Sequence, residues 1–429
     1  MEAQVTNYQC PACTAPLAFS PDTGKLDCSH CGSQFELAEI EAMYKEEEEQ
    51  AAENLLEAQF DLSGLSQDWG EDADKVRVYS CPSCTAELIC DETTAATSCP
   101  YCGNPTVVPG QLSGTLKPDC LIPFRMDRQA AEEALKKHYQ GKFFLPKRFK
   151  EESHLQEIQG VYVPFWLFDG KAQGSASYRA TRSRTYVQGS YRVTETSHYR
   201  ATREGQLDFE KVPVDASTKM PDSHMDSIEP YDYSELQPFS TAFLPGFLAD
   251  KYDVSAEDSQ PRAASRCEES LAQALRDTVT GYDSVTNNGR NICIEKGTVR
   301  YALLPVWMLS TRWKDQNFLF AMNGQTGKLV GDLPVNWGKY WLTFGLLTLA
   351  LGLLTAVIAL FAGSGNPLVW GVVVGLLLAL IICSILKSGM KNVAAASEAG
   401  NYISAPLELT SKEDWFTHRT HSRVKIEKK

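Results

Sequence analysis

The longest apolar pattern in the chain lies near its C-terminal end. The 47 residues from Tyr340 to Leu386 contain no charged side chain. One helix of that length would measure about 70 Å, more than twice the roughly 30 Å of a bilayer's hydrocarbon core. Turn-forming residues, Gly363-Ser-Gly-Asn-Pro367, interrupt the run. The pattern therefore predicts two membrane-spanning helices, about Tyr340–Ala362 and Leu368–Leu386, and a pair of buried core helices is the alternative.

Charges flank the predicted spans on one side only. Lys339 precedes the first span, Lys387 and Lys391 follow the second, and the loop between them is uncharged. Because Lys and Arg stay on the cytoplasmic side of a membrane, we expect a hairpin in the cell (inner) membrane with both termini cytoplasmic. Gly371 and Gly375 form a small-xxx-small face, which predicts close packing of the two spans. Neither span contains an ionisable side chain, so the hairpin is predicted to be an anchor and not an ion path.

The region between Cys120 and Trp337 alternates helical and strand patterns. A helix is predicted from Asp127, a suitable N-cap, to near Gly141, and a second one from about Glu257. Between them, segments rich in Tyr, Thr, Val and Arg predict antiparallel hairpins with one polar face. The pentapeptide YRATR occurs at Tyr178–Arg182 and again at Tyr199–Arg203, which predicts that these two segments pair.

Two further patterns lie in the same region. VYVPFWLF at 161–168 resembles YALLPVWML at 301–309, and each follows a predicted helix, which suggests two related α/β halves. Gly324-Gln-Thr-Gly327-Lys328 is similar to a phosphate-binding loop, but its spacing is short and Leu329 stands where Ser or Thr would bind magnesium. We interpret it as a hairpin turn. The chain contains no HExxH, GxSxG or GxGxxG motif, so we expect no enzyme and name no catalytic residue.

Eight of the 13 cysteines form a repeated pattern. Two C-x2-C pairs separated by fourteen residues occur once near the N-terminus and again 71 residues later, and CPACTAPL at the first site matches CPSCTAEL at the second. Two such loops can close a tetrahedral four-thiolate site. The glycine after each last cysteine, Gly32 and Gly103, suits a turn with positive φ. The predicted metal ligands are Cys10, Cys13, Cys28 and Cys31 at one site, and Cys81, Cys84, Cys99 and Cys102 at the other.

Zinc is the metal that this pattern favours. Disulfides would need an oxidising compartment, and the start MEAQVTNYQC lacks the basic residues and apolar run of a signal peptide. An iron–sulfur cluster also takes four cysteines, but symmetric knuckle pairs are more typical of zinc. Four cysteines fill the coordination shell, so we predict two structural Zn²⁺ sites and no ligand role for His30. The remaining cysteines are interpreted as lone thiols.

Charge is distributed unevenly along the chain. The formal net charge is −13, but residues 1–110 carry 20 Asp/Glu against 4 Lys/Arg, and the remainder is close to +3. An acidic N-terminal quarter argues against binding to a phosphate backbone, because such binding depends on Lys and Arg. The block Glu46–Glu49 is either a solvated face or a docking surface for a basic partner.

These patterns predict a multidomain α+β protein with two four-cysteine zinc ribbons, an antiparallel-sheet-rich α+β domain and a two-helix transmembrane hairpin. The predicted division is zinc ribbon 1 over residues 1–36, an acidic helical linker over 37–75, zinc ribbon 2 over 76–110, a cytoplasmic α+β domain over 111–337, the hairpin over 338–387 and a cytoplasmic tail over 388–429.

The order of these segments resembles a known family. The tandem CPxC…CxxCG ribbons, VYVPFWLFD, FAMNGQTGKLVGDLPV and the following hairpin are similar to the bacterial TFIIB-type zinc-ribbon membrane proteins. Members are encoded beside a phage-shock-protein-A homologue and an SPFH (flotillin-like) protein. The resemblance covers most of the chain. It implies a membrane scaffold that assembles with the SPFH partner, in a homo- or hetero-oligomer, and recruits the phage-shock protein during envelope stress.

Two other functions are also compatible with the sequence. Some relatives carry a primosomal-helicase label, which would make the ribbons a nucleic-acid module, although the acidic N-terminal quarter opposes this. The α+β domain could instead hold the site of a membrane-bound enzyme. The Arg- and Tyr-rich strands either bind lipid headgroups or nucleic acid, or form a solvated sheet face in which Arg stems cover Tyr rings.

Overall fold

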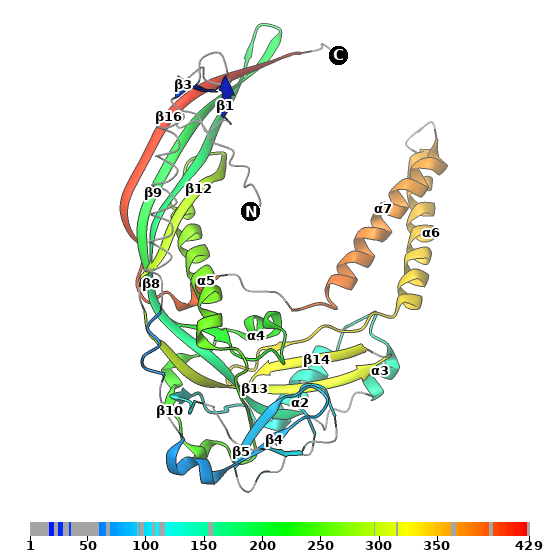
Figure 1. The fold of residues 1–429 in the computed structure, drawn as a ribbon. Helices are drawn as coiled ribbons and strands as arrows, with labels where there is room; N and C mark the ends of the chain where they lie inside the picture. The colour runs from blue at the N-terminus through cyan, green and yellow to red at the C-terminus, as the bar shows by residue number, and fades with distance from the viewer. Residues whose placement is uncertain are drawn as a thin grey trace.

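The structure is a computed structural model, and it describes residues 17–20, 25–28, 34–35, 60–65, 69–91, 94, 98–104, 108–110, 116–152, 158–295, 297–314, 316–361, 366–393 and 398–426. Figure 1 shows an arch. A mixed α/β body forms its base, a long curved arm of strands rises from one side, and a helical hairpin rises from the other.

The body is organised around one large mixed sheet. Its central strands follow the order β10-β7-β13-β8-β11-β5-β4-β6, and most pairs are antiparallel, while β11–β8 and β13–β7 are parallel. The strands of this path are β4 (Val76–Ser80), β5 (Glu87–Asp91), β6 (Val108–Gly110), β7 (Cys120–Leu121), β8 (Gln159–Gln188), β10 (Gln237–Pro238), β11 (Leu248–Asp250) and β13 (Val299–Trp313).

The two echoing segments pair with each other at the centre of the sheet. β8 and β13 are antiparallel, with Pro164 opposite Leu303 and Pro305 opposite Tyr162. Their side chains supply much of the core on both faces of the sheet, because Val161, Val163 and Phe165 belong to one buried cluster and Tyr162 and Trp166 to another. The nearly continuous apolar sequence of each segment follows from this two-sided burial.

The arm is a long antiparallel ribbon. β8 continues for 30 residues and pairs along its length with the 25-residue strand β9 (Tyr191–Asp215). The two YRATR segments face each other, with Tyr178 opposite Ala201 and Ala180 opposite Tyr199, which confirms the predicted pairing. β12 (Ser284–Glu295) covers the lower part of the other edge of β8.

The C-terminal segment differs from the prediction. Residues 388–429 were expected to be a tail, but Glu408–Lys425 form the 18-residue strand β16, which pairs with β9 from Gln206 to Tyr191. This strand completes the arm. It shows no alternation of apolar and polar residues because both of its faces are exposed along most of its length.

Helices cover parts of the sheet and of the lower arm. Asp127 caps α2 as predicted, with its carboxylate accepting from the Ala130 N–H at 2.8 Å, and Ser255 caps α5 close to the expected start. α5 packs against β8, β9 and β12 and buries its Leu271 and Leu275 there. The helices of the body are α2 (Arg128–His138), α3 (Lys147–Glu152), α4 (Asp222–Ile228) and α5 (Ala256–Asp277), with 3₁₀ turns at Gly70–Lys75, Tyr233–Glu235, Thr241–Phe243 and Gly400–Tyr402.

The NGQTG segment is a hairpin turn, as predicted. It joins β14 (Gln316–Asn323) to β15 (Leu329–Val330), and Asn323 exchanges backbone hydrogen bonds with Gly327 and Lys328. The Asn323 carboxamide oxygen accepts from the backbone N–H groups of Gln325 and Thr326, and Gly327 has φ 75°. The backbone N–H groups that would cradle a phosphate are thus partly used by the turn itself.

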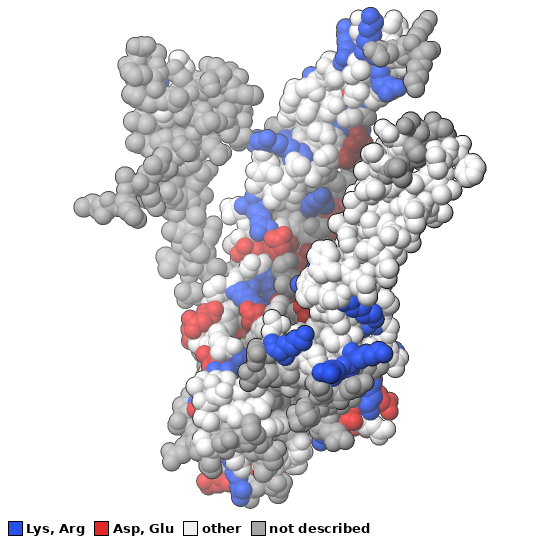
Figure 2. All heavy atoms as spheres, turned by 90° about the vertical axis from the view of Figure 1, so that its right-hand side faces the viewer, with Lys and Arg blue, Asp and Glu red and all other residues white. Residues whose placement is uncertain are grey.

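The two predicted spans form helices α6 (Trp337–Phe361) and α7 (Pro367–Ser388). Both are long and apolar enough to cross a membrane, and only 6 % and 22 % of their most apolar windows are buried. Within the described residues, neither helix is buried in the body as a core helix would be. Figure 2 shows the hairpin as an uncharged surface that meets Lys and Arg side chains where it joins the body.

The helices of the hairpin approach each other closely at glycines. A Cβ added at Gly371 would lie 2.7 Å from the Gly352 oxygen and 2.8 Å from the Ala356 Cβ, and one added at Gly375 would lie 2.7 Å from the Gly352 Cα. The small-xxx-small face therefore packs inside the hairpin, as predicted.

We expect Gly371→Ala to destabilise the hairpin by about 1–3 kcal/mol, because its methyl group has no room against the facing helix. Thermal unfolding in detergent micelles measures the effect. Gly345→Ala is the matched control, since a Cβ there meets nothing within 4 Å. Equal unfolding midpoints for the two variants would contradict the packing described here.

The N-terminal part of the chain contributes a separate three-stranded sheet. Its strands are β1 (Leu17–Ser20), β2 (Lys25–Cys28) and β3 (Gln34–Phe35), in antiparallel order β1-β2-β3. Most of the predicted acidic linker lies outside the described residues. In the described part of the linker, Phe60 is buried against Phe168, and Asp61 forms an isolated parallel β-bridge with Thr298 of the body.

Candidate metal centre

Two knuckles bring four cysteines together. Cys81 and Cys84 lie in the turn between β4 and β5, and Cys99 and Cys102 lie in the loop that follows β5. In the first knuckle the Thr85 N–H donates to the Cys81 carbonyl at 2.9 Å, and in the second the Gly103 N–H donates to the Cys99 carbonyl at 2.9 Å. The two loops therefore share one backbone conformation.

The residue after each knuckle adopts positive φ. Gly103 has φ 69°, as its identity predicts, and Thr85 has φ 59° at the equivalent place. A β-branched residue in this region is strained. Its hydroxyl donates to the Cys84 carbonyl at 2.7 Å and accepts from the Lys219 ammonium at 3.2 Å, which fixes the loop in this shape.

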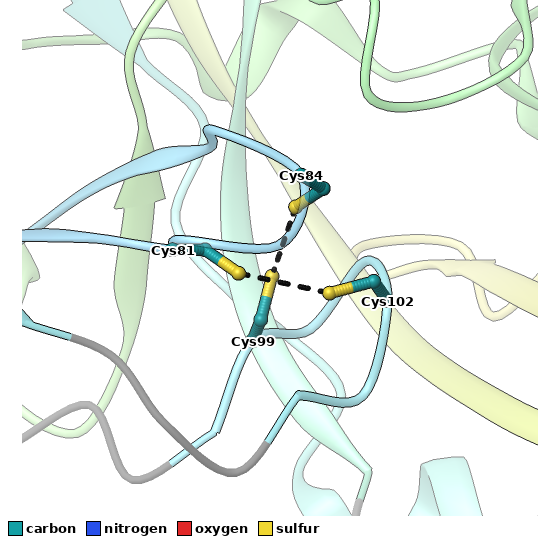
Figure 3. A group of neighbouring side chains, drawn as sticks. All are labelled: Cys81, Cys84, Cys99 and Cys102. Atoms are coloured by element: carbon teal, nitrogen blue, oxygen red, sulfur yellow. Dashed lines mark hydrogen bonds between the residues drawn. The ribbon is translucent and has the colours of Figure 1, made fainter.

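The sulfur positions fit a tetrahedral metal site. All four Sγ atoms lie within 4.8 Å of one another, with 3.7 Å between Cys81 and Cys102 and 3.5 Å between Cys84 and Cys99 (Figure 3). A tetrahedron with metal–sulfur bonds of about 2.3 Å has edges of about 3.8 Å, whereas a disulfide needs about 2.05 Å. The spacing therefore fits ligands around one ion and excludes disulfides in this geometry.

Burial determines the protonation of these thiols when no cation is bound. It raises the pKa of Cys84 to about 11 and that of Cys99 well above its usual range. Burial also opposes ionisation of Cys81, but the backbone N–H groups of Cys84 and Ser83 outweigh it and lower that pKa to about 7. A cation must therefore displace protons to bind four thiolates.

Metal affinity is consequently expected to depend steeply on pH. At least two protons, those on Cys84 and Cys99, leave on binding, so the association constant for Zn²⁺ should fall at least about 100-fold for each pH unit lost below pH 8. A competition titration with a chromophoric chelator between pH 6 and pH 8 measures this. The double variant Cys10→Ser/Cys13→Ser leaves one complete four-cysteine set for the experiment, and a slope of tenfold or less would contradict the expectation.

The second predicted ribbon is part of the large sheet. β5 pairs antiparallel with β11, with Ala249 opposite Ile89, so strand pairing continues across residue 110, where the sequence division placed a boundary. Tyr101, inside the second knuckle, donates its hydroxyl to Asp250 at 2.6 Å, and Ser217 donates to the same carboxylate at 2.7 Å. The cysteine cluster is thus joined to the core of the body by a buried hydrogen-bond chain.

The eight predicted ligands have different outcomes. Cys81, Cys84, Cys99 and Cys102 are brought together as predicted. Cys10, Cys13 and Cys31 lie outside the described residues, together with Gly32 and His30, and of Cys28 the structure describes the backbone at the end of β2. Among the other described cysteines, Cys120, Cys267 and Cys383 are buried thiols, as predicted, while Cys293 is only half-buried; Cys90 is buried as well.

Sequence reasoning missed two residues that support the centre. Tyr101 and Thr85 carry no metal-ligand signal, and their roles depend on Asp250 and Lys219, which lie more than 100 residues away. The tyrosine inside the Cys99–Cys102 knuckle is the one local hint, because a buried aromatic hydroxyl needs a partner.

Comparisons with known proteins place the chain in a family. No family model and no solved structure matches it. Over 361 residues the chain is 36 % identical to YdjG of Bacillus subtilis strain 168, an uncharacterized protein, and the alignment covers 84 % of this chain and 99 % of YdjG. The chain belongs to the YdjG family. The alignment is longer than any one of the regions into which the sequence was divided, so the relationship to YdjG spans several of them.

Proposed function

We propose that this YdjG-family protein is a non-enzymatic, membrane-anchored zinc-ribbon scaffold that assembles with an SPFH-type partner and recruits a phage-shock-type protein. The observation that carries this proposal is the combination of an exposed apolar hairpin and a long exposed arm on one body. The hairpin would confine the arm to the membrane surface, and confinement raises the effective concentration of partners without new contacts.

Zinc is the proposed ion at the four-cysteine cluster. An all-thiolate tetrahedral set is typical of structural zinc and offers no open coordination position for a substrate. Its role would be to fix β4, β5 and the knuckle loop against the body. Because the cysteine pattern is repeated, we propose a second zinc ion at the N-terminal set of four cysteines, which gives two ions per chain.

The hairpin is the proposed membrane anchor. Leu346, Leu353 and Leu380 are between 53 % and 62 % exposed, which is costly in water and favourable in lipid. Lys339 and Lys387 lie at the base of the hairpin. Because Lys and Arg stay on the cytoplasmic side of a membrane, we propose that the body and both termini are cytoplasmic. A fluorescent protein fused to the C-terminus should then fluoresce, whereas alkaline phosphatase fused there should be inactive.

The arm limits how the hairpin can sit in a bilayer. Arm and hairpin extend in the same direction from opposite ends of the body (Figure 1), and the arm carries charged residues such as Arg192, Glu195 and Arg419 that cannot enter hydrocarbon. Insertion therefore requires the hairpin to lean away from the arm. Tilts of up to about 40° are within the range of membrane helices.

The arm offers a surface for protein partners. β16 pairs with β9 on one side, and within the described residues no strand pairs with its other side. An open edge of this kind can accept a strand from another protein. Trp415 and Phe416 are 63 % and 53 % exposed at its centre, where aromatic side chains commonly anchor interfaces.

Affinity purification tests this function. The full chain is tagged, solubilised from stressed and unstressed cells in mild detergent, and analysed by mass spectrometry for SPFH-type and phage-shock-type proteins. The paired variant Trp415→Glu/Phe416→Glu should lose the partner while staying in the membrane, and Arg423→Glu on the same strand is the control. Recovery of neither class of partner under either condition would reject the proposal, and salt-dependent recovery of nucleic acid would favour the alternative.

A further inference from the structure

The segment around Phe143 lies far from the hairpin in the sequence but packs against its base. The Lys339 ammonium lies 3.8 Å from the centre of the Phe143 ring and donates to the Phe143 carbonyl at 2.6 Å. The neighbouring Phe144 is buried and packs against the Tyr340 ring with centroids 5.3 Å apart. The backbone N–H of Asn336 donates to the Phe144 carbonyl at 2.9 Å. The segment is therefore fixed at the level where α6 begins.

This segment is basic and partly apolar, in contrast to the acidic chain as a whole. Residues 142–149 contain three Lys or Arg and no Asp or Glu, and α3 ends in Glu151 and Glu152, while the net charge of the chain is −13. Lys147 and Arg148 at the start of α3 are exposed, and Phe143 is 45 % exposed. Figure 2 shows Lys and Arg side chains gathered where the uncharged hairpin meets the body.

The base of the hairpin adds further cations and aromatic rings at the same level. The Lys387 ammonium lies 4.8 Å from the centre of the Trp337 ring, and Lys142 donates to the Gly389 carbonyl. Trp337 and Trp341 are 52 % and 61 % exposed. Tryptophan and lysine at one level are typical of the membrane–water interface. Asp332 is an acid near this base, and its carboxylate accepts from the Asn392 N–H.

We infer that the segment Lys142–Phe149, which we call the collar, is a docking surface for anionic phospholipid headgroups. The inference rests on the proposed insertion of the hairpin. In Figure 1 α3 lies below the base of α6, at the end of the body away from the arm. The lean that keeps the charged arm out of the hydrocarbon therefore lowers the collar onto the bilayer.

The chemistry of the collar fits this partner. Phe143 enters the boundary between headgroups and acyl chains, as aromatic side chains do at interfaces. Lys147 and Arg148 attract the negative surface of the cytoplasmic leaflet, which acts within about one Debye length. The collar thus supplies a second attachment beside the hairpin and holds the body at a defined angle to the membrane.

Photocrosslinking in vesicles tests the collar without using cysteines. The full chain carries benzoylphenylalanine in place of Phe143 and is reconstituted in vesicles of equal parts phosphatidylcholine and phosphatidylglycerol. Irradiation should yield lipid adducts that are enriched in phosphatidylglycerol. The same probe at Leu353 reports hairpin insertion by forming adducts with both lipids, and the probe at Phe416 on the arm should form none.

Charge removal provides the second readout. The pair Lys147→Gln/Arg148→Gln should lower the phosphatidylglycerol enrichment at position 143 by about fivefold for each charge removed, while Lys412→Gln on the arm should leave it unchanged. Adducts at position 353 but not at 143, or adducts at 143 with copurified nucleic acid in place of lipid, would overturn the inference and leave the hairpin intact. A lack of adducts at 353 would instead reject the proposed membrane anchor itself.

Discussion

Cys99→Ser should remove the proposed metal ion from the four-cysteine cluster and loosen the sheet edge beside it. Cys99 is 1 % exposed, and its sulfur lies 3.5 Å from that of Cys84. In isolated zinc-finger peptides, binding of structural zinc contributes about 10–16 kcal/mol to folding. We therefore expect the loss of one ligand to destabilise this region by more than the roughly 2–5 kcal/mol that a large core truncation costs. Metal analysis of the purified protein and limited proteolysis around residues 92–98 measure the two effects.

Cys293→Ser is the matched control for this experiment. Its sulfur lies 3.6 Å from the Gln173 carbonyl oxygen in the arm, away from the knuckles, and the thiol is half-buried. We expect an unchanged metal content and an unchanged proteolysis pattern. A Cys99→Ser protein that keeps the wild-type metal content would show that the four sulfurs do not hold an ion together.

Arg266→Ala is expected to destabilise the body by about 3–5 kcal/mol, because it leaves Glu229 charged and buried without its partner. Arg266 is 3 % exposed and forms two hydrogen bonds with Glu229, at 3.0 and 2.6 Å, and a third with the Pro213 carbonyl. Burial opposes the charge of Arg266, but Glu229 outweighs it and raises the arginine's pKa. Urea unfolding in detergent, followed by tryptophan fluorescence, measures the free energy of unfolding.

Two further variants separate the lost pairing from lost volume. Arg290→Ala breaks an ion pair with Glu269 of the same 2.6 Å length whose side chains are 36 % and 44 % exposed, so it should cost less than about 1 kcal/mol. The double variant Arg266→Met/Glu229→Met removes both buried charges and should recover at least half of the loss. If Arg266→Ala and the double variant lowered the free energy of unfolding equally, the electrostatic explanation would be contradicted.

The sequence predicted the features that depend on local chemistry. The hairpin follows from an uncharged run, and the knuckles follow from C-x2-C spacing and a glycine with positive φ. The YRATR repeat predicted strand pairing because identical residues suit equivalent positions of one ribbon. In each of these cases, the signal and the structure that it produces lie within a few tens of residues.

Features that depend on distant partners were not predictable from patterning. β16 contains the sequence ELTSKEDWFTHRTHSRVK, which lacks alternation because no core covers either face of the outer arm. Its identity as a strand depends on β9, about 200 residues earlier. The fusion of the second ribbon with the body likewise depends on the pairing of β5 with β11 and on the hydrogen bond between Tyr101 and Asp250.

The position of β16 after the hairpin has a consequence for how the chain is made. During synthesis the strands of the arm emerge before α6 and α7, but the outer edge of β9 has no partner until residues 408–425 leave the ribosome. Domains fold in the order in which they emerge, and an uncovered strand edge invites aggregation. Synthesis of α6 and α7 therefore precedes closure of the arm, and a chain truncated before residue 408 would be released with that edge open.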